Sequence, residues 1–370
     1  MNSIKNIYQE KYQRVLVTGG AGFIGSCLIR ELLKTTNSKV FNLDVLSYSS
    51  DLTSINSTLK EYEINEKRYE HLLVDLKNYE DVNKAINYSN PDLIFHLAAE
   101  SHVDRSIDNP KPFIKNNIIG TLNLLEISSI HYQNLSESKK NAFRLINIST
   151  DEVYGSLDNM SLFNEESSYN PTSPYSASKA SSDHLVNAWY HTYGLPTITT
   201  NCSNNFGPWQ FPEKLIPLTI NKALSKQNIP LYGDGKNIRD WLFVEDHVNA
   251  LLKLSFLGKL GNKYCIGGYK ELTNLEIVES ICEKLDILRP INHSYKELIN
   301  FVKDRPGHDF RYAIDATKIE KDISWKSKTE FSIALEKTII WYLNNQSWCE
   351  KVLKKSGYKG ERVGLQNNLG

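Results

Sequence analysis

The sequence lacks the features of membrane, secreted and nucleic-acid-binding proteins. No apolar run reaches the roughly 20 residues that span a bilayer, and the polar N-terminus, residues 1–13, has no apolar core typical of a signal peptide. Basic and acidic side chains both number 43, so the formal net charge is zero and no attraction to nucleic acid or an anionic membrane is expected. These absences favour a cytoplasmic protein without a nucleic-acid or membrane partner.

Cysteine is scarce and scattered. The five cysteines are Cys27, Cys202, Cys265, Cys282 and Cys349, and no pair has Cys-x-x-Cys spacing. An odd number of widely separated thiols is not typical of a disulfide framework or a structural zinc site. The sequence therefore predicts reduced thiols and no metal.

The first half alternates short apolar runs with amphipathic stretches, a pattern that predicts a parallel sheet covered by helices. The expected strands are Arg14–Val17, Val40–Leu43, His71–Val74, Leu93–Leu97, Arg144–Ser149 and Thr197–Asn201. The expected helices between them are Gly22–Lys34, Tyr79–Asn87, Pro112–Ser129 and Ser176–Tyr193. Beyond about residue 204, Pro and Gly recur and the pattern loosens. We predict an α/β protein with a Rossmann-type doubly wound parallel sheet at 13–203, to which some later segments return, and an interleaved, smaller C-terminal α/β substrate lobe at 204–362.

A glycine-rich turn follows the first expected strand and opens a helix. The predicted contacts to a dinucleotide pyrophosphate are Gly19, Gly22, Phe23, Ile24 and Gly25. Such glycines allow a tight turn and close approach of the backbone to phosphate at a helix N-terminus. Asp44 ends the second strand about 20 residues later, where a carboxylate binds the ribose hydroxyls and repels a 2′-phosphate. The pattern favours NAD over NADP, with a plain loop and a turn cap as the alternatives.

Two further strand ends are predicted to contact the cofactor. Asp75 and Leu76 follow the third strand, where the adenine is expected. Leu97, Ala98 and Ala99 follow the fourth strand and provide small side chains beside the cofactor. Core packing explains the second group equally well. Both groups lie at the carboxyl edge of the sheet, where ligands bind in open α/β proteins.

Tyr175 and Lys179 are four residues apart at the start of an expected helix, so they share one helical face. A nearby ammonium favours the phenolate and should lower the Tyr175 pKa towards the working pH. Such a tyrosine removes the proton of a sugar hydroxyl while hydride leaves the same carbon. The pair predicts hydride chemistry with a nicotinamide.

Thr150, Asp151 and Glu152 close the fifth strand at the same edge. The Thr150 hydroxyl is placed to bond the substrate hydroxyl that Tyr175 deprotonates. Two adjacent carboxyls in a desolvated pocket do not readily both ionise, so their pKa values should separate. We assign Asp151 as the acid that protonates a departing C6 hydroxyl and Glu152 as the base at C5. The alternative is a capped loop with solvated carboxylates.

Six short blocks carry a resemblance to a known family. They are Ala98–Ser106 (AAESHVDRS), Ser149–Gly155 (STDEVYG), Tyr175–Lys179 (YSASK), Ser203–Pro208 (SNNFGP), Pro212–Pro217 (PEKLIP) and Asp304–Asp309 (DRPGHD). From Val15 to about Arg362 the chain resembles the extended short-chain dehydrogenase/reductases of the NAD-dependent epimerase/dehydratase family. Within that family it is similar to the nucleotide-sugar 4,6-dehydratases, because the epimerases lack the Asp-Glu step after the threonine.

The resemblance implies an NAD-dependent lyase that converts dTDP-glucose to dTDP-4-keto-6-deoxyglucose and water, a step of deoxysugar synthesis such as that of dTDP-rhamnose. It implies catalytic roles for Thr150, Asp151, Glu152, Tyr175 and Lys179. Further cofactor contacts implied by it are Leu46, Ser47, Asn116 and Asn205. The implied substrate pocket consists of Ser101, Thr150, Asn204, Lys214, Leu215, Pro230, Tyr232, Arg239, Asn274, Arg305 and His308. It also implies a homodimer, formed through the helices at 112–129 and 176–193.

The chemistry of the implied pocket residues supports part of that set. Arginines at 239 and 305 suit a diphosphate, and an aromatic ring at 232 suits a pyrimidine. The alternatives are a surface salt bridge of Arg239 with Asp240 or Asp234, and a structural role for His308. Other functions consistent with the residues are a UDP-hexose 4-epimerase, a UDP-glucuronate decarboxylase, or an NAD-binding regulatory protein with a silent site.

Overall fold

A seven-stranded parallel sheet forms the centre of the computed structural model, which describes residues 2–158 and 160–358. Its strand order is β10-β6-β5-β4-β1-β2-β3, and every neighbouring pair is parallel. The strands are β1 (Arg14–Thr18), β2 (Lys39–Leu43), β3 (Tyr69–Leu72), β4 (Leu93–His96), β5 (Arg144–Thr150), β6 (Thr197–Cys202) and β10 (Lys263–Ile266). The order reverses beside β1, so the carboxyl ends of β1 and β4 open a crevice. The predicted doubly wound fold is confirmed.

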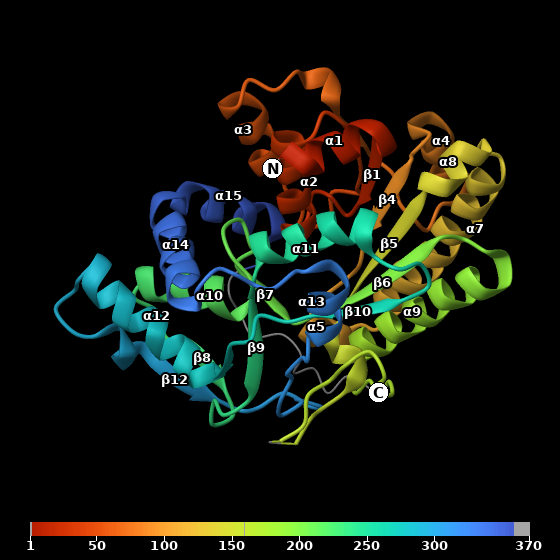
Figure 1. The fold of residues 1–370 in the computed structure, drawn as a ribbon. Helices are drawn as coiled ribbons and strands as arrows, with labels where there is room; N and C mark the ends of the chain where they lie inside the picture. Colours follow the sequence, from red (N-terminus) through yellow and green to blue (C-terminus); the bar gives the residue numbers. More distant parts are fainter. Residues whose placement is uncertain (1, 159, 359–370) are drawn as a thin grey trace.

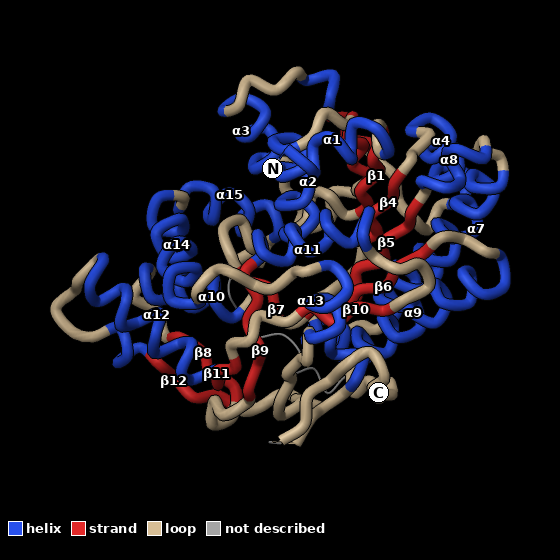
Figure 2. Tube along the Cα trace, viewed as in Figure 1, coloured by secondary structure: helices blue, strands red, loops and turns tan. Residues whose placement is uncertain are grey.

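Helices cover both faces of the sheet (Figures 1 and 2). One face carries α4 (Tyr79–Ser89), α7 (Gly120–Gln133) and α9 (Pro174–Tyr193). Helix α7 lies between the other two and contacts both. The other face carries α2 (Phe23–Thr35) and α11 (Val244–Leu257), flanked by α3 (Thr53–Glu61) and α13 (Thr317–Ile323). The central strands are buried on both sides, which explains why they are almost continuously apolar.

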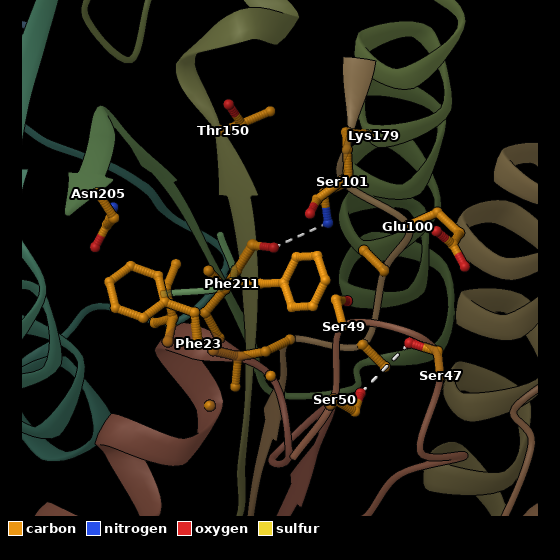
Figure 3. Close-up of a pocket in the computed structure, with 18 of the residues that line it drawn as sticks. Phe23, Ser47, Ser49, Ser50, Glu100, Ser101, Thr150, Lys179, Asn205 and Phe211 are labelled. Carbon is orange, nitrogen blue, oxygen red and sulfur yellow. Dashed lines mark hydrogen bonds between the residues drawn. The ribbon is translucent and has the colours of Figure 1, made fainter. Parts of the chain in front are cut away.

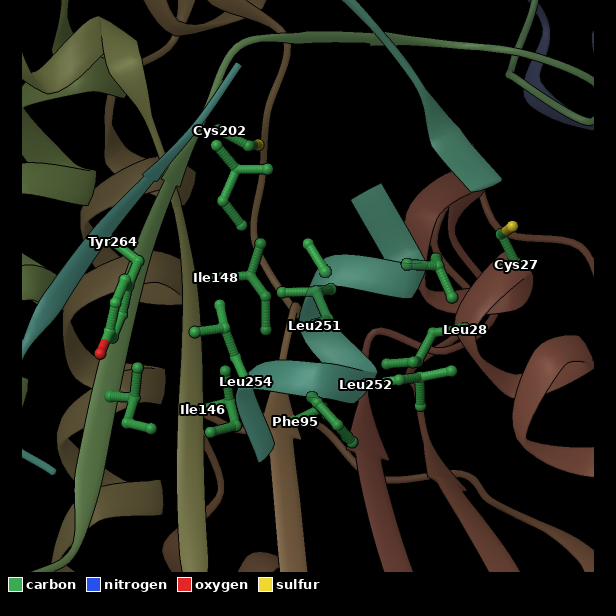
Figure 4. Packing of buried hydrophobic residues seen from close by; sticks show 14 of the residues in the cluster. Cys27, Leu28, Phe95, Ile146, Ile148, Cys202, Leu251, Leu252, Leu254 and Tyr264 are labelled. Atoms are coloured by element: carbon green, nitrogen blue, oxygen red, sulfur yellow. The ribbon is translucent and has the colours of Figure 1, made fainter. Parts of the chain in front are cut away.

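The largest hydrophobic cluster lies between the sheet and the α2–α11 layer. Figure 4 shows Leu251 and Leu254 of α11 directed at Ile146 and Ile148 of β5. Helix α11 and strand β10 come from the second half of the chain yet complete the core of the first half. Folding of the cofactor domain therefore requires the chain beyond residue 243.

The second half also builds a smaller lobe, seen at the lower left of Figure 1. It contains two small sheets, β11-β9-β7 and β12-β8. Its strands are β7 (Asn204–Phe206), β8 (Ile229–Tyr232), β9 (Ile238–Phe243), β11 (Glu271–Thr273) and β12 (Ile299–Val302). Its helices are α10 (Leu215–Leu224), α12 (Asn274–Leu288), α14 (Phe331–Asn344) and α15 (Gln346–Ser356). These elements enclose a second apolar cluster of their own. Residues 359–362 of the predicted lobe lie outside the described residues.

The remaining helices are short. They are α1 (Asn2–Lys11), α5 (Val103–Asp108), α6 (Lys111–Phe113), α8 (Glu137–Ala142), the π-helix η2 (Ile114–Ile119), and the 3₁₀ turns η1 (Glu66–Arg68), η3 (Asp151–Tyr154) and η4 (Tyr295–Leu298). The helix expected at 112–129 thus contains a π segment, and such segments are frequent at functional sites. The strand expected at 71–74 instead occupies 69–72, because Tyr69–Leu72 pair with Val40–Leu43 of β2.

No helix within the described ranges has the length and apolar character required to span a membrane. All five cysteines are free and buried.

Candidate active site

One cavity of about 580 Å³ runs along the carboxyl edge of the sheet and into the junction with the lobe. Figure 3 shows Phe23 from the start of α2 and Ser47 from the loop after β2 around the same space as Thr150 of β5 and Lys179 of α9. Asn205 and Phe211 reach this space from the lobe. The cavity brings together every predicted catalytic residue and every predicted cofactor residue except Leu46. Leu46 has a left-handed backbone (φ 55°), and its neighbours Val45 and Ser47 line the cavity in its place.

The glycine-rich turn packs too tightly for side chains. A Cβ on Gly25 would lie 2.3 Å from the Gly19 carbonyl oxygen, and one on Gly19 would lie 2.6 Å from the Ala98 nitrogen. Gly19 also has a φ of 69°, which L side chains rarely adopt. Gly22 caps α2 without any side-chain hydrogen bond. The first turn of α2 therefore presents its backbone N–H groups to the cavity.

Asp44 lines the cavity and also holds the turn in place. One carboxylate oxygen accepts the Ala21 N–H at 2.9 Å, and the other accepts the Leu46 N–H at 2.8 Å. The turn-cap alternative for Asp44 is thus part of the structure, and contact with a ribose remains a prediction. The carboxylate joins the glycine turn to the loop after β2.

Tyr175 and Lys179 lie one turn apart in the first part of α9, and both side chains are buried at the cavity wall. A capping box formed by Ser173 and Ser176, with Pro174 in the first turn, fixes the start of this helix. The Lys179 ammonium donates to the Ile148 carbonyl at 2.9 Å. Burial raises the Tyr175 pKa well above its ordinary value, and the charge of Glu152 adds to the effect. The predicted lowering of the Tyr175 pKa is therefore wrong, because burial decides the direction of the shift.

Thr150, Asp151 and Glu152 form the junction of β5 with η3. The Thr150 hydroxyl donates to Asp151 Oδ1 at 3.2 Å and accepts the Glu152 N–H at 3.2 Å. Asp151 is 1% exposed, and its Oδ2 has no partner among the described residues. The alternative of two solvated carboxylates is therefore wrong for Asp151.

The two carboxyls have different surroundings. Burial and the charge of Glu152 raise the Asp151 pKa well above its ordinary value, which favours the protonated form of Asp151. Burial also raises the Glu152 pKa, but the positive charges of Arg305, Lys214 and Arg239 oppose the shift. The cations favour ionised Glu152 beside neutral Asp151. This is the division of labour that an acid and a base require.

Of the predicted substrate residues, Ser101, Thr150, Asn204, Lys214 and Leu215 line the cavity. The other six do not line it and lie in the lobe: Pro230, Tyr232, Arg239, Asn274, Arg305 and His308. The structure thus brings the predicted substrate residues from the two halves near one another without joining all of them in one cavity.

Arg239 is 5% exposed and makes no surface salt bridge, so the alternative with Asp240 or Asp234 is wrong. Its guanidinium donates to the Asp309 carbonyl at 3.0 Å and lies over the Tyr312 ring at 4.4 Å. His308 bonds Asp304 at 2.6 Å, so the structural role considered for His308 is present. The turn at Gly233–Gly235 follows β8 with left-handed glycines at both ends.

Asp104 of α5 joins the cofactor half to the lobe. Its Oδ1 accepts from Arg305 at 2.9 Å, and its Oδ2 accepts the Tyr232 hydroxyl at 2.8 Å. The Nε of Arg305 is buried without a partner among the described residues. One edge of the guanidinium is therefore anchored, while a donor remains for an anion.

Sequence reasoning missed a second cluster between the halves. Glu213 accepts the Tyr48 hydroxyl at 2.8 Å and the Arg105 Nε at 3.1 Å, and Arg105 lies over the Tyr48 ring at 4.2 Å. Lys214 donates to the Ser101 carbonyl at 2.9 Å. We call Tyr48, Arg105 and Glu213 the inter-lobe triad. A signal existed, because Glu213 and Arg105 both lie in the distinctive sequence blocks.

Comparison with known proteins identifies the family. The family model for GDP-mannose 4,6 dehydratase matches residues 16–338. The chain belongs to this family. A dTDP-glucose 4,6-dehydratase of Escherichia coli is 50% identical over 366 residues, which cover 95% of the chain and 99% of that protein. The predicted resemblance is confirmed at the level of family and fold.

The chain is also similar to two solved structures of 4,6-dehydratases. The dTDP-glucose 4,6-dehydratase of Bacillus anthracis, solved with NAD, is 40% identical with a TM-score of 0.78, covering 91% of the chain and 99% of that protein. The enzyme of the same name from Streptomyces venezuelae, solved with NAD and a dTDP ligand, is 37% identical with a TM-score of 0.81. The match covers 92% of the chain and 99% of that protein.

Proposed function

We propose that the protein is an NAD-dependent dTDP-glucose 4,6-dehydratase, which forms dTDP-4-keto-6-deoxyglucose and water. The observation that carries the proposal is the meeting, in one cavity, of Tyr175 and Lys179 with the unlike carboxyls Asp151 and Glu152. A simple dehydrogenase needs the first pair only. The names of the relatives support the same activity.

The cavity residues fit a dinucleotide. The glycine turn excludes side chains from the N-terminus of α2, and the uncapped first turn suits a diphosphate. We propose that Gly19, Gly22, Phe23, Ile24, Gly25, Asp44 and Ser47 hold the adenosine diphosphate part, with Leu46 acting through its backbone. Asp75, Leu76, Leu97, Ala98, Ala99, Asn116 and Asn205 contact the remainder. When bound, NAD accepts hydride from C4 and returns it at C6.

The protein's own groups move the protons. Tyr175 as phenolate takes the proton of the C4 hydroxyl, held by Thr150, and the charge of Lys179 supports the phenolate. The C4 ketone acidifies the C5 hydrogen, which Glu152 removes as a proton. Asp151 gives its proton to the C6 hydroxyl, which leaves as water. Glu152 then returns its proton to C5. With the hydride that NAD would return to C6, neither oxidant nor reductant would be consumed overall.

We propose that Ser101, Asn204, Lys214 and Leu215 contact the sugar and phosphates from the cavity wall. Pro230, Tyr232, Arg239, Asn274, Arg305 and His308 complete the nucleotide site from the lobe. The unpartnered Arg305 Nε supports this assignment, because a diphosphate oxygen would satisfy it. In this proposal residues 13–203 bind NAD, with β10 and α11 returning to them, and residues 204–362 bind the nucleotide sugar.

Product masses from a panel of dTDP-, UDP-, CDP- and GDP-glucose test the activity. We expect dTDP-glucose to lose the mass of one water without accumulation of NADH. An unchanged mass with inverted stereochemistry at C4 would indicate an epimerase. Release of carbon dioxide from UDP-glucuronate would indicate a decarboxylase, and no turnover of any sugar nucleotide would favour a regulatory protein.

We also propose a cytoplasmic homodimer. Ile114, Ile119 and Ile130 are exposed along η2 and α7, and Tyr193 is exposed at the end of α9. Apolar side chains on this outer layer support pairing through α7 and α9. Light scattering after size-exclusion chromatography tests the dimer, and charge substitution at Ile130 should weaken it. The free, buried thiols support a reducing compartment.

A further inference from the structure

Asp183 is a buried carboxylate on the same face of α9 as the proposed catalytic residues Tyr175 and Lys179. Tyr175, Lys179 and Asp183 are spaced four residues apart, so they lie along one face of the helix. Asp183 is 3% exposed and does not line the cavity. The proton transfers described above do not use it. A buried charge of this kind is costly to keep, which raises the question of what it does.

Burial raises the Asp183 pKa, while the charge of Lys179 and the hydrogen bonds to the carboxylate oppose that shift and favour the ionised form. Its Oδ1 accepts Asn147 Nδ2 at 2.9 Å, and its Oδ2 accepts the Tyr169 hydroxyl at 3.0 Å and Asn201 Nδ2 at 3.1 Å. All three partners donate, and a carboxylate accepts from donors without itself needing a proton. Asp183 makes no ion pair in the described parts of the chain. Its negative charge is therefore not neutralised by a direct contact.

Lys179 is the neighbouring group that benefits from this charge. Burial lowers the Lys179 pKa, and Asp183 is the largest influence that opposes the shift. Cys202 also faces Lys179, but burial raises the thiol pKa to about 12, so the thiol is neutral at physiological pH. His96 is neutral as well, because burial and Lys179 lower its pKa to about 3. Asp183 thus supplies the carboxylate charge on this side of Lys179.

The other groups around Asp183 do not replace it. Tyr169 is neutral because burial and the charge of Asp183 raise its pKa. Tyr154 packs on Tyr169, and burial raises its pKa, so it is neutral as well. His184 lies beside the Tyr169 ring, and Lys263 lies over that ring at 5.0 Å. Because Lys263 is itself a basic side chain, it cannot replace the carboxylate of Asp183 as a negative charge near Lys179. On the cavity side, Glu152 and Asp151 face Tyr175.

We propose that Asp183 is a positioning residue for the hydride steps, a fixed buried anion that keeps Lys179 in its charged form so that Lys179 can support the Tyr175 phenolate. The inference rests on the proposed function and deepens it. One face of α9 then carries three groups that act together: the phenol of Tyr175, the ammonium of Lys179 and the carboxylate of Asp183. Only the first two members reach the cavity.

The test is the pH dependence of kcat in Asp183→Asn. The substitution keeps the size of the side chain, and the new amide can find acceptors because Asn147 Oδ1 and Asn201 Oδ1 are both buried without partners. With the charge removed, Lys179 loses its proton at lower pH. The alkaline limb of the pH profile of kcat should therefore move down by about one pH unit, and kcat at pH values above the new limb should be about 10-fold lower than in the wild type.

Two controls separate electrostatics from damage to the core. Asp183→Glu keeps the charge and should leave the limbs near their wild-type positions even where the plateau falls. Glu165→Gln removes another buried carboxylate, one that accepts the Cys265 N–H at 2.7 Å away from Lys179, and should leave both limbs unmoved. In the Lys179→Met background, Asp183→Asn should have little further effect on kcat, because the proposed action passes through the lysine.

The inference would be overturned if the alkaline limb of Asp183→Asn stayed at its wild-type pH. An equal shift of that limb in Glu165→Gln would overturn it too. Should Asp183→Asn fail to fold, Tyr169→Phe removes one donor from the carboxylate and is expected to move the alkaline limb in the same direction by less. An unmoved limb in folded Tyr169→Phe would then overturn it. Failure of the proposed function is distinct: wild-type protein in the same assay would release no water from dTDP-glucose.

Discussion

The two halves of the site are built in different ways. In the cofactor half, the candidate residues follow strand ends of one parallel sheet, and backbone geometry alone brings them to a common edge. In the lobe, the candidate residues come from short separate segments and depend on side-chain contacts such as those of Asp104 and Glu213. The first half is preorganised by the fold, and the second by buried ion pairs and hydrogen bonds across the junction.

This difference predicts different failures. Substitutions in the cofactor half should change chemistry or NAD retention, because the sheet holds everything else in place. Substitutions at the contacts of Asp104 with the lobe should change the affinity for the nucleotide sugar with little change in the chemical step. Each experiment below tests one side of that contrast.

The largest effect is expected for Glu152→Gln. The amide keeps the size of the side chain but cannot take the C5 proton, so kcat for dehydration should fall about 10³- to 10⁴-fold. Bound NAD and the KM for dTDP-glucose should change little. Single-turnover absorbance at 340 nm should reveal NADH formed by C4 oxidation and not consumed. If Glu152→Gln lost bound NAD in proportion to its loss of kcat, the acid–base pair would also hold the cofactor. Chemistry and cofactor retention would then not be separable at this site.

Gly25→Ala should come next, with loss of the cofactor. The added Cβ meets the Gly19 carbonyl oxygen at 2.3 Å and the Gly20 Cα at 2.8 Å, so the turn has to shift. Overpacking of this kind costs about 1–3 kcal/mol, and NAD affinity should fall about 10- to 100-fold. Equilibrium dialysis with labelled NAD measures it.

The matched control for Gly25 is Gly194→Ala. Gly194 caps the far end of α9 with a φ of 69° and has no atom within 4 Å of a built Cβ. We expect a lower melting temperature and unchanged NAD binding. Similar NAD loss in both variants would show that general destabilisation, and not the turn, governs retention.

The sequence predicted the cofactor half well for a physical reason. Strand, turn and helix follow one another locally, so Gly19 to Gly25 and Asp44 could be placed at the sheet edge from their spacing alone. Tyr175 and Lys179 share a helix, and their proximity follows from its period. Their pKa values did not follow, because burial depends on the whole fold.

The lobe was less predictable because its contacts are long-range. Asp104 meets Arg305 across 201 positions, and Tyr48 meets Glu213 across 165. Nothing local in the sequence pairs these residues. Likewise, β10 joins the central sheet beside β6 only after the chain has built β7, α10, β8 and β9 of the lobe and returned through α11. The resemblance supplied candidates in the lobe, while their partners came from the structure.

At the junction, Asp104→Asn should raise the KM for dTDP-glucose about 10- to 30-fold while kcat changes less than about threefold, since hydrogen bonds to charged groups contribute about 1.5–3 kcal/mol. The amide can accept from only one of Arg305 and Tyr232, and its own N–H group repels the guanidinium. Steady-state kinetics and the affinity for dTDP measure the effect. Tyr232→Phe, which removes only the hydroxyl contact, should have a smaller effect.

An ion pair that does not involve α5 provides the control for Asp104. Arg311 binds Glu271 through two bonds of 2.6 and 2.9 Å. Glu271→Gln should lower thermal stability without changing KM. A KM increase as large as that of Asp104→Asn would mean that any loosening of the lobe weakens substrate binding, and the special role of α5 would be lost.

The smallest effect is expected where the halves touch beside the cofactor, at the inter-lobe triad. Tyr48→Phe removes one hydrogen bond to Glu213 but leaves the ring under Arg105 and the Arg105–Glu213 contact. A single hydrogen bond contributes about 0.5–1.5 kcal/mol, so release of labelled NAD should accelerate about threefold, with kcat unchanged. Ser47, Ser49 and Ser50 of the same loop line the cavity, which is why the loop should affect retention. A rise in KM for dTDP-glucose without faster NAD release would assign the triad to the substrate side, and the boundary between the two halves would then run between Tyr48 and Ser47.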